Sequence, residues 1–110
     1  MEIPNDLFYT VEHEWIRLKN NQATVGITDF AQGQLGDVVF VELPAEGLEL
    51  AEKSTLGVVE SVKTVSDIYV PVTGKVVAVN KDLESQPELV NSDPYGQGWM
   101  IEIEISNSSP

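Results

Sequence analysis

The sequence predicts a mostly β protein in which two antiparallel sheets form a small flattened barrel or sandwich, with one or two short helices. Apolar residues recur at every second position, or in short β-branched runs, along nearly the whole chain. Gly, Pro, Asn and Asp separate these runs at intervals of about 8 to 12 residues, which is typical of sandwiches and barrels. A chain of 110 residues with 42% hydrophobic residues can form one domain with one core. We expect a single domain over residues 1–105 and a disordered polar tail over residues 106–110.

The first two strands are expected on either side of a polar turn. Trp15–Leu18 and Ala23–Thr28 flank the polar residues 19–22. Apolar residues occupy every second position of the later segment, so one of its faces is expected to point toward the core. The two segments therefore predict a β-hairpin.

A short helix is predicted directly after this hairpin. Thr28 and Asp29 are residue types that cap a helix N-terminus, and Phe30–Leu35 follows them. Gly36 is suited to end the helix after about two turns.

The rest of the chain is expected to add strands and one helical turn near Pro87–Val90. In the last strand, Trp99, Ile101, Ile103 and Ile105 alternate with Met100, Glu102 and Glu104. The strands expected after the helix are Val38–Leu43, Leu56–Ser61, Val65–Val72, Lys75–Asn80 and Trp99–Ile105.

Two glycines are expected to be required by the backbone conformation rather than by contact with a ligand. Gly36 and Gly74 each lie where one strand-like run ends and another begins. If either adopts a positive φ, substitution by Val should cost about 1–3 kcal/mol of stability.

Charge and composition exclude several classes of partner and site. The chain has 18 acidic and 6 basic residues and a net charge of −12, so nucleic acid and anionic membranes are poor partners. Cysteine is absent, which excludes disulfides and thiolate metal sites. The sequence lacks an apolar run of about 18 residues and a basic export signal at its start, so we expect a cytoplasmic protein without a membrane segment.

Most catalytic constellations are missing from the sequence. His13 is the one histidine, and a lone histidine between two glutamates is typically a surface or capping residue. The segment 33–36 has two glycines but not the Lys-Ser/Thr of a phosphate loop. We therefore expect neither a metal site nor an enzyme that acts alone.

Lys63 stands out because two strand-like runs converge on it. The nearest other lysines, Lys53 and Lys75, lie outside this predicted hairpin tip. Glu60, Ser66 and Asp67 keep its surroundings polar, as a modifying enzyme that needs an exposed amine on a rigid turn requires. The alternative is an ordinary surface lysine, and spacing alone leaves both interpretations open.

Several segments, in the same order along nearly the whole chain, resemble the glycine cleavage system H protein family. Together they are far more specific than the Glu-Ser-Val-Lys sequence around Lys63 alone. They are His13–Trp15, Val25–Ala31, Leu35–Pro44, Val59–Lys63, Pro71–Val76, Leu89–Gly96 and Gly98–Ile101.

The resemblance implies a lipoyl-domain-like fold, or barrel-sandwich hybrid, with lipoate attached to Lys63 in amide linkage. It further implies a lipoate ligase or lipoyl transferase, which we expect to recognise Glu60 and Asp67. Glu14 and Asp67 match positions near a cleft that receives the lipoyl arm, although a glutamate in a strand is commonly solvent-exposed. Family members usually continue beyond the last strand into a C-terminal helix, whereas this sequence stops at Pro110.

The resemblance also implies a function and a set of partners. A pyridoxal-phosphate-dependent glycine decarboxylase transfers the aminomethyl group of glycine to the lipoyl sulfur, and a tetrahydrofolate-dependent aminomethyltransferase then takes the one-carbon unit. Dihydrolipoamide dehydrogenase reoxidises the arm. The protein itself would be a monomeric carrier that supplies binding, orientation and shelter.

Three other carrier functions are alternatives to this interpretation of the sequence. Biotin carriers normally have methionines beside the lysine, whereas Val62 and Thr64 flank Lys63. Lipoyl domains of 2-oxoacid dehydrogenases usually present Asp-Lys-Ala within a longer chain. An H-like protein that mainly donates lipoate to other enzymes remains the strongest alternative.

Overall fold

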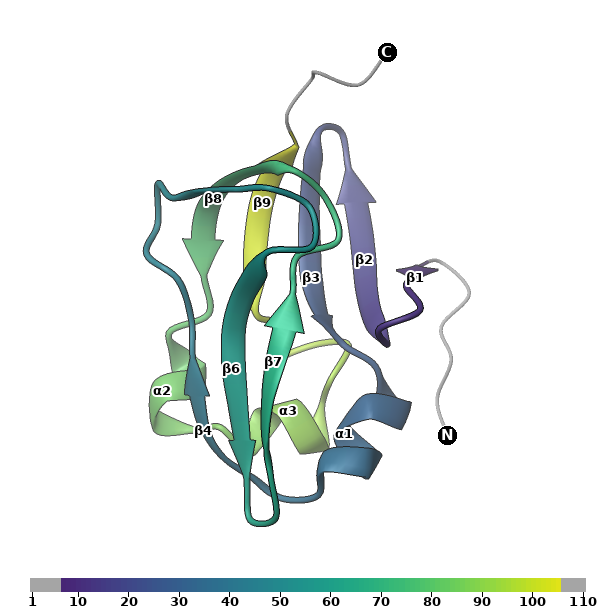
Figure 1. The fold of residues 1–110 in the computed structure, drawn as a ribbon, viewed down its shortest axis with the longest axis vertical. Helices are drawn as coiled ribbons and strands as arrows, with labels where there is room; N and C mark the ends of the chain where they lie inside the picture. Colours follow the sequence, from purple (N-terminus) through teal and green to yellow (C-terminus); the bar gives the residue numbers. More distant parts are fainter. Residues whose placement is uncertain (1–6, 106–110) are drawn as a thin grey trace.

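A computed structural model describes residues 7–105 of the chain, as nine strands and three short helices (Figure 1). The predicted tail at residues 106–110 lies outside the described residues. The helices are α1 (Asp29–Leu35), α2 (Asp82–Ser85) and α3 (Leu89–Ser92). The strands are β1 (Phe8–Tyr9), β2 (Glu14–Lys19), β3 (Gln22–Ile27), β4 (Val38–Glu42), β5 (Glu49–Leu50), β6 (Thr55–Ser61), β7 (Val65–Tyr69), β8 (Gly74–Val79) and β9 (Ile101–Ile105).

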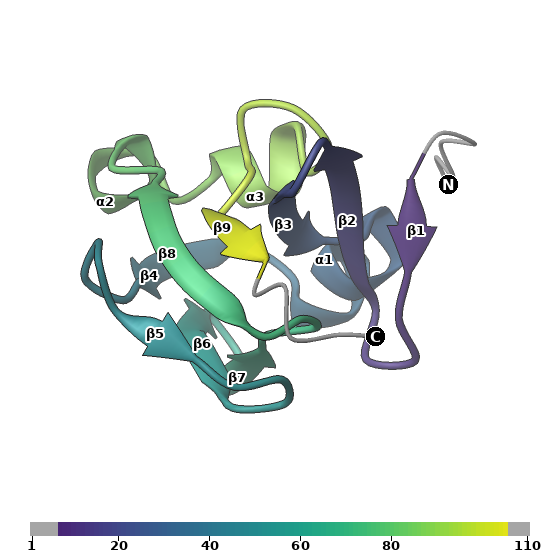
Figure 2. The ribbon, with the colours of Figure 1, turned by 90° about the horizontal axis from the view of Figure 1, so that it is seen from above.

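The strands form two antiparallel sheets, which confirms the predicted fold class. One sheet has six strands in the order β1-β2-β3-β9-β8-β5, and the other has three in the order β4-β6-β7. Within the described residues both sheets stay open at their edges, so they form a sandwich rather than a closed barrel. Figure 2 shows the smaller sheet on one side of β8, β9 and β3, with β1 at the outer edge beyond β2.

The core lies between the two sheets and follows from the period-two pattern of the strands. Val25 and Ile103 of the larger sheet are fully buried, as is Val59 of the smaller one. Burying an aliphatic side chain contributes about 1.5–3 kcal/mol, so these residues hold the sheets together. The other strand residues of this cluster are Ile16, Ala23, Ile27, Val38, Val41, Leu56, Ile68, Val76 and Ile101.

A second, smaller cluster fixes the start of α1. Leu7, Trp15 and Tyr95 pack together, and the Trp15 indole donates a hydrogen bond to the Pro94 carbonyl (2.8 Å). The Tyr95 hydroxyl in turn accepts a hydrogen bond from the Asp29 amide (2.8 Å). As predicted, Thr28 caps α1, because its hydroxyl accepts from the Ala31 amide (3.1 Å).

The sequence missed three short elements and misplaced one helical turn. β1 and β5 have two residues each, too few for a periodic pattern to show. α2 has four residues and was not expected, and the turn predicted near Pro87–Val90 forms slightly later, as α3. The prediction of the first hairpin was correct, because Lys19 pairs with Gln22 on either side of a turn at residues 20–21.

Two predicted strands are shorter than expected. β7 ends at Tyr69 rather than Val72, because the Val70 amide donates to the Ser54 carbonyl and Pro71 has no amide hydrogen to donate. β9 begins at Ile101, and the expected alternation fails before it: Met100 is fully buried, whereas Trp99 is partly exposed. Trp99 instead packs against the Leu7–Trp15–Tyr95 cluster.

Gly36 and Gly74 are constrained by the backbone for two different reasons. Gly36 ends α1 with φ of 81°, the left-handed region that glycine adopts most easily. Gly74 does not have a positive φ, so that part of the expectation was wrong for this residue. A Cβ at position 74 would instead overlap the backbone carbonyl oxygen of Glu104 on the neighbouring strand.

Replacing either glycine by alanine is expected to destabilise the protein by about 1–3 kcal/mol, through left-handed strain at Gly36 and steric overlap at Gly74. Gly33→Ala is the matched control, because no described residue, apart from its chain neighbours and its own helix backbone, lies within 4 Å of its Cβ position. The control should be neutral or slightly stabilising, since alanine is the better helix former. Urea unfolding of the three variants measures the difference, and equal midpoints would contradict the expectation.

Candidate functional site: a lysine at a hairpin tip beside a cleft

Lys63 lies in the turn that joins β6 to β7, as the sequence predicted. The turn comprises residues 62–64 and lies at the opposite end of the molecule from the C-terminal end of β9 (Figure 1). Ser61 closes it: its amide donates to the Thr64 carbonyl (2.8 Å), and its hydroxyl accepts from the amides of Lys63 (3.3 Å) and Thr64 (3.1 Å). This buried serine, which the sequence analysis did not single out, makes the turn compact.

The Lys63 side chain is exposed and extends over Gly36. Its Cε lies 3.5 Å from the position that a Cβ of Gly36 would occupy. Within residues 7–105, the Lys63 ammonium makes no ion pair or side-chain hydrogen bond. The amine is therefore accessible, as acylation requires.

A cleft begins beside this turn and runs along β7. It has a volume of about 370 Å³ and lies between β7, α1 and the start of β2. Both sequence-predicted cleft residues, Glu14 and Asp67, line it. Its other lining residues are Glu12, His13, Ile27, Phe30, Ala31, Gln34, Leu35, Val65, Ser66, Ile68 and Tyr69.

Glu14 is buried rather than solvent-exposed, with 3% of its surface accessible. Its Oε1 accepts a hydrogen bond from the Thr10 hydroxyl (2.8 Å), and its Oε2 accepts one from the Tyr69 amide (3.3 Å). Burial raises the pKa of this carboxyl above its ordinary value, and the two hydrogen bonds only partly oppose that effect. A positive charge brought into the cleft would therefore find a carboxylate with little competing water.

Glu60 and Asp67 lie on the same face of the β6–β7 hairpin. Glu60 pairs with Val65 and Val58 pairs with Asp67, so the two acidic residues are diagonal neighbours on adjacent strands. Both are exposed. The structure thus places one acidic pair next to the turn that carries Lys63, and Asp67 alone also reaches the cleft.

His13 lines the cleft, a position that could not be predicted from the two glutamates beside it in the sequence. Its backbone is left-handed, with φ of 67°, and its carbonyl accepts a hydrogen bond from the Thr28 amide (3.0 Å). The imidazole packs against Phe30 of α1, with ring centroids 4.7 Å apart. His13 therefore links the start of β2 to the helix that forms one wall of the cleft.

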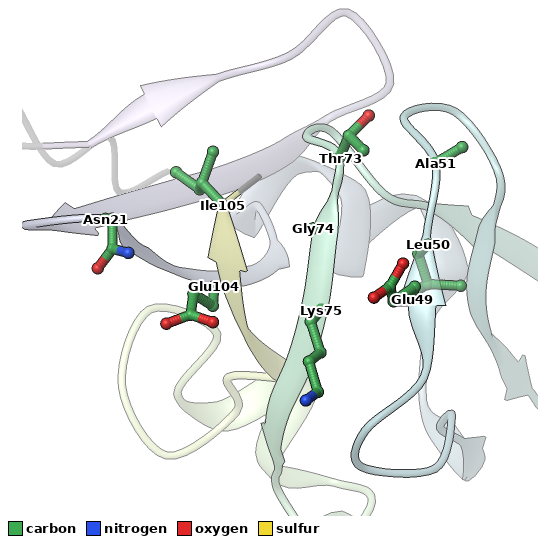
Figure 3. Close-up of a pocket in the computed structure, with 9 residues that line it drawn as sticks. All are labelled: Asn21, Glu49, Leu50, Ala51, Thr73, Gly74, Lys75, Glu104 and Ile105. Carbon is green, nitrogen blue, oxygen red and sulfur yellow. The ribbon is translucent and has the colours of Figure 1, made fainter. Parts of the chain in front are cut away.

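A larger hollow of about 540 Å³ lies at the opposite end of the molecule (Figure 3). There Lys75 of β8 is in register with Glu49 of β5 and with Glu104 of β9. Lys75 is also exposed, but it lies in mid-strand between two carboxylates rather than at a hairpin tip. This contrast favours Lys63 over Lys75 as a modified residue.

Two kinds of feature are absent from the described residues. No group of three or more His, Asp or Glu side chains in residues 7–105 is arranged to hold a metal ion. No helix in the same part of the chain is long and apolar enough to cross a membrane.

A two-sheet β sandwich with a lysine at a hairpin tip is the arrangement of the lipoyl-domain-like barrel-sandwich proteins, a class of small carrier domains. Comparison with known proteins identifies the family within this class. The family model described as "Glycine cleavage H-protein" matches residues 7–110, and the chain belongs to this family.

Individual relatives agree with this assignment. The chain is 64% identical over 105 residues to the glycine cleavage system H protein of Symbiobacterium thermophilum, covering 96% of this chain and 82% of the relative. It is 59% identical over 106 residues to that of Salinibacter ruber, with 96% and 86% covered. The crystal structure of a glycine cleavage system H protein from Mycobacterium marinum superposes with a TM-score of 0.91 at 40% identity, over 94% of this chain and 87% of that one. H proteins are lipoate carriers, so this chain is a carrier component of the glycine cleavage system.

The raised pKa of Glu14 predicts a specific pH dependence of stability. The folded state holds the Glu14 proton more tightly than the unfolded state, so the wild type should lose stability relative to Glu14→Gln as pH rises above about 4.5. The loss is at most about 1.4 kcal/mol per pH unit and stops once the buried carboxyl has ionised. Urea unfolding of both proteins between pH 4 and pH 8 measures it. A difference between the two proteins that is constant across this range would contradict the prediction.

Proposed function

We propose that Lys63 carries lipoate in amide linkage, and that the chain conveys the aminomethyl group of glycine from glycine decarboxylase to the tetrahydrofolate-dependent aminomethyltransferase. Dihydrolipoamide dehydrogenase then reoxidises the arm. The observation that carries the proposal is the position of Lys63, exposed on a closed hairpin turn in a member of the H-protein family. Bound lipoate supplies the dithiolane chemistry that a chain without cysteine lacks.

The surroundings of Lys63 fit a long acyl group. The side chain is free of ion pairs among the described residues, and the neighbouring position 36 has no Cβ to hinder its stem. The cleft of about 370 Å³ begins at Val65, two residues beyond the lysine. Its walls include the apolar residues Ile27, Leu35 and Ile68, so an aliphatic arm has an apolar surface to lie against.

Glu14 and Asp67 give the cleft a preference for a positively charged cargo. Among residues 7–105, only Thr10 and Tyr69 donate hydrogen bonds to the buried Glu14 carboxylate, so it retains capacity to accept one from an ammonium group. A neutral disulfide gains nothing from these carboxylates. The cleft would therefore retain the arm while it holds a protonated amine and release it afterwards.

The acidic surface supports transient binding to several enzymes. A net charge of −12 favours active-site entrances lined by basic residues, and electrostatic attraction of this kind raises association rates more than affinity. The exposed pair Glu60 and Asp67 lies beside the modified turn, so we propose that the lipoate ligase or lipoyl transferase recognises it.

Lys63→Arg is expected to abolish lipoylation and all carrier activity, because arginine keeps the charge but has no acylatable amine. Incubation with lipoate, ATP and a lipoate ligase, followed by intact-mass measurement, should leave the variant unmodified. The glycine–bicarbonate exchange reaction of glycine decarboxylase measures carrier activity and separates a role in the cycle from a role as lipoate donor.

Lys53→Arg and Lys75→Arg are the matched controls and should be lipoylated normally. Peptide mapping of the wild type should find the lipoyl group on Lys63 alone. A lipoyl group on Lys53 or Lys75 would show that the assignment is wrong.

Glu14→Ala is expected to accelerate spontaneous ammonia release from the aminomethyl-loaded carrier, by about 5- to 150-fold if one charged hydrogen bond of about 1–3 kcal/mol is lost. Ammonia is measured without the aminomethyltransferase. Glu46→Ala, which removes a carboxylate from an exposed loop, should release ammonia at the wild-type rate. Lipoylation should be unaffected in both variants, since Lys63 lies outside the cleft. Equal release from Glu14→Ala and wild type would mean that Glu14 does not shelter the cargo.

A further inference from the structure

The side chain of Asn91, in α3, makes three hydrogen bonds to the chain around the end of α1 and the start of β4. Its Oδ1 accepts a hydrogen bond from the Val38 amide (2.8 Å). Its Nδ2 donates to the Gly36 carbonyl (2.8 Å) and to Oε1 of Gln32 (2.9 Å). Only one orientation of the amide satisfies all three partners, so the side chain is fixed.

Asp37 lies between Gly36 and Val38, whose backbones Asn91 binds, and it connects this segment to the lysine turn. Its carbonyl accepts a hydrogen bond from the Val62 amide (3.0 Å). Since the residues on both sides of Asp37 are held, the direction of its carbonyl is fixed too. Gly36, one of the held residues, also lies under the Lys63 stem. A side chain 28 positions from Lys63 in the sequence thus holds the segment against which the lysine turn lies.

We propose that Asn91 is a positioning residue that sets the orientation of Lys63 relative to α1 and the cleft. The inference rests on the proposed function of Lys63 as the lipoyl attachment site. Asn91 contacts neither Lys63 nor the cleft, so it acts through Gly36, Asp37 and Val62. Without it, the turn keeps its own closure by Ser61 and the pairing of Val38 with Ser61, but the Gly36–Asp37 segment that the Val62 amide bonds to is held less firmly.

This role predicts a particular kinetic signature in lipoylation. A turn that samples several positions is less often in the one that the ligase binds, so the KM for the protein rises. Once the turn is bound, the ligase itself holds it, so kcat changes little. A variant that is only less stable, but still folded at the assay temperature, alters neither constant.

Asn80 provides a matched control, because it makes the same kind of contact elsewhere in the fold. Its Nδ2 donates to the carbonyls of Gln97 (2.7 Å) and Trp99 (2.8 Å), and its Oδ1 accepts from the Asp82 amide (3.2 Å). Its side chain is buried. None of these partners contacts the 62–64 turn, so Asn80→Ala removes a comparable set of bonds without affecting the position of Lys63.

The experiment compares wild type, Asn91→Ala and Asn80→Ala in two measurements below their unfolding temperatures. The first is amide hydrogen exchange of Val62, read by NMR. The second is steady-state lipoylation with lipoate, ATP and a lipoate ligase, with the carrier as varied substrate. If Asn91→Ala does not fold, Asn91→Asp replaces it, because it keeps the acceptor for the Val38 amide while its second carboxylate oxygen repels the Gly36 carbonyl oxygen instead of donating to it.

For Asn91→Ala we expect Val62 exchange at least tenfold faster than in wild type and a KM raised about three- to tenfold, with kcat within about twofold. Asn80→Ala should match wild type in both measurements despite its lower stability. If the two variants have the same Val62 exchange and the same KM, Asn91 is merely structural and the inference is wrong. If wild type itself is not lipoylated on Lys63, the proposed function fails instead, and the exchange data still decide whether Asn91 fixes the turn.

Discussion

The hydrogen bond from the Val62 amide to the Asp37 carbonyl joins the lysine turn to the rest of the protein. A β-hairpin that projects beyond its sheet has few contacts of its own, so its tip normally moves more than its base. Here the tip is tied to the segment that leaves α1, and α1 is itself fixed at its start by Thr28 and Tyr95. Hydrogen bonds therefore connect the lysine turn to α1, the helix that forms one wall of the cleft. A carrier that must present the same group to several enzymes benefits from such a fixed origin for its flexible arm.

The second physical feature of the site is the contrast between its buried and its exposed carboxylates. The chain is strongly acidic, and most of its carboxylates lie in water, where they contribute to long-range attraction but to little specific binding. Glu14 differs because Trp15 and Ile16 follow it into the core and the Tyr69 amide approaches it from β7. A carboxylate with little water around it interacts more strongly with a nearby cation than an exposed one does. The same fold thus keeps most carboxylates in water and places one buried carboxylate at the cleft.

Most of the fold was predictable from local pattern, and the errors have a common cause. The first hairpin, α1 and the strands β4, β6 and β8 follow from period-two alternation, a threonine cap and glycine positions, all of which act within a few residues. The prediction failed where a distant partner decided the outcome. β7 ends early because Val70 pairs with Ser54, and Trp99 leaves the strand pattern because it packs against the cluster around Trp15. Such contacts join residues that no sequence window contains together.

The sequence by itself determined the sandwich fold, the hairpin with Lys63 at its tip and, through several matching segments, the family. These features depend on local periodicity and on short motifs, and both can be recognised within short stretches of consecutive residues. Only the tertiary structure decided that Glu14 is buried and that Asn91 holds the segment next to the lysine turn. Burial and hydrogen-bond partners depend on how strands and helices far apart in the chain pack together, and packing is a property of the whole core rather than of any segment.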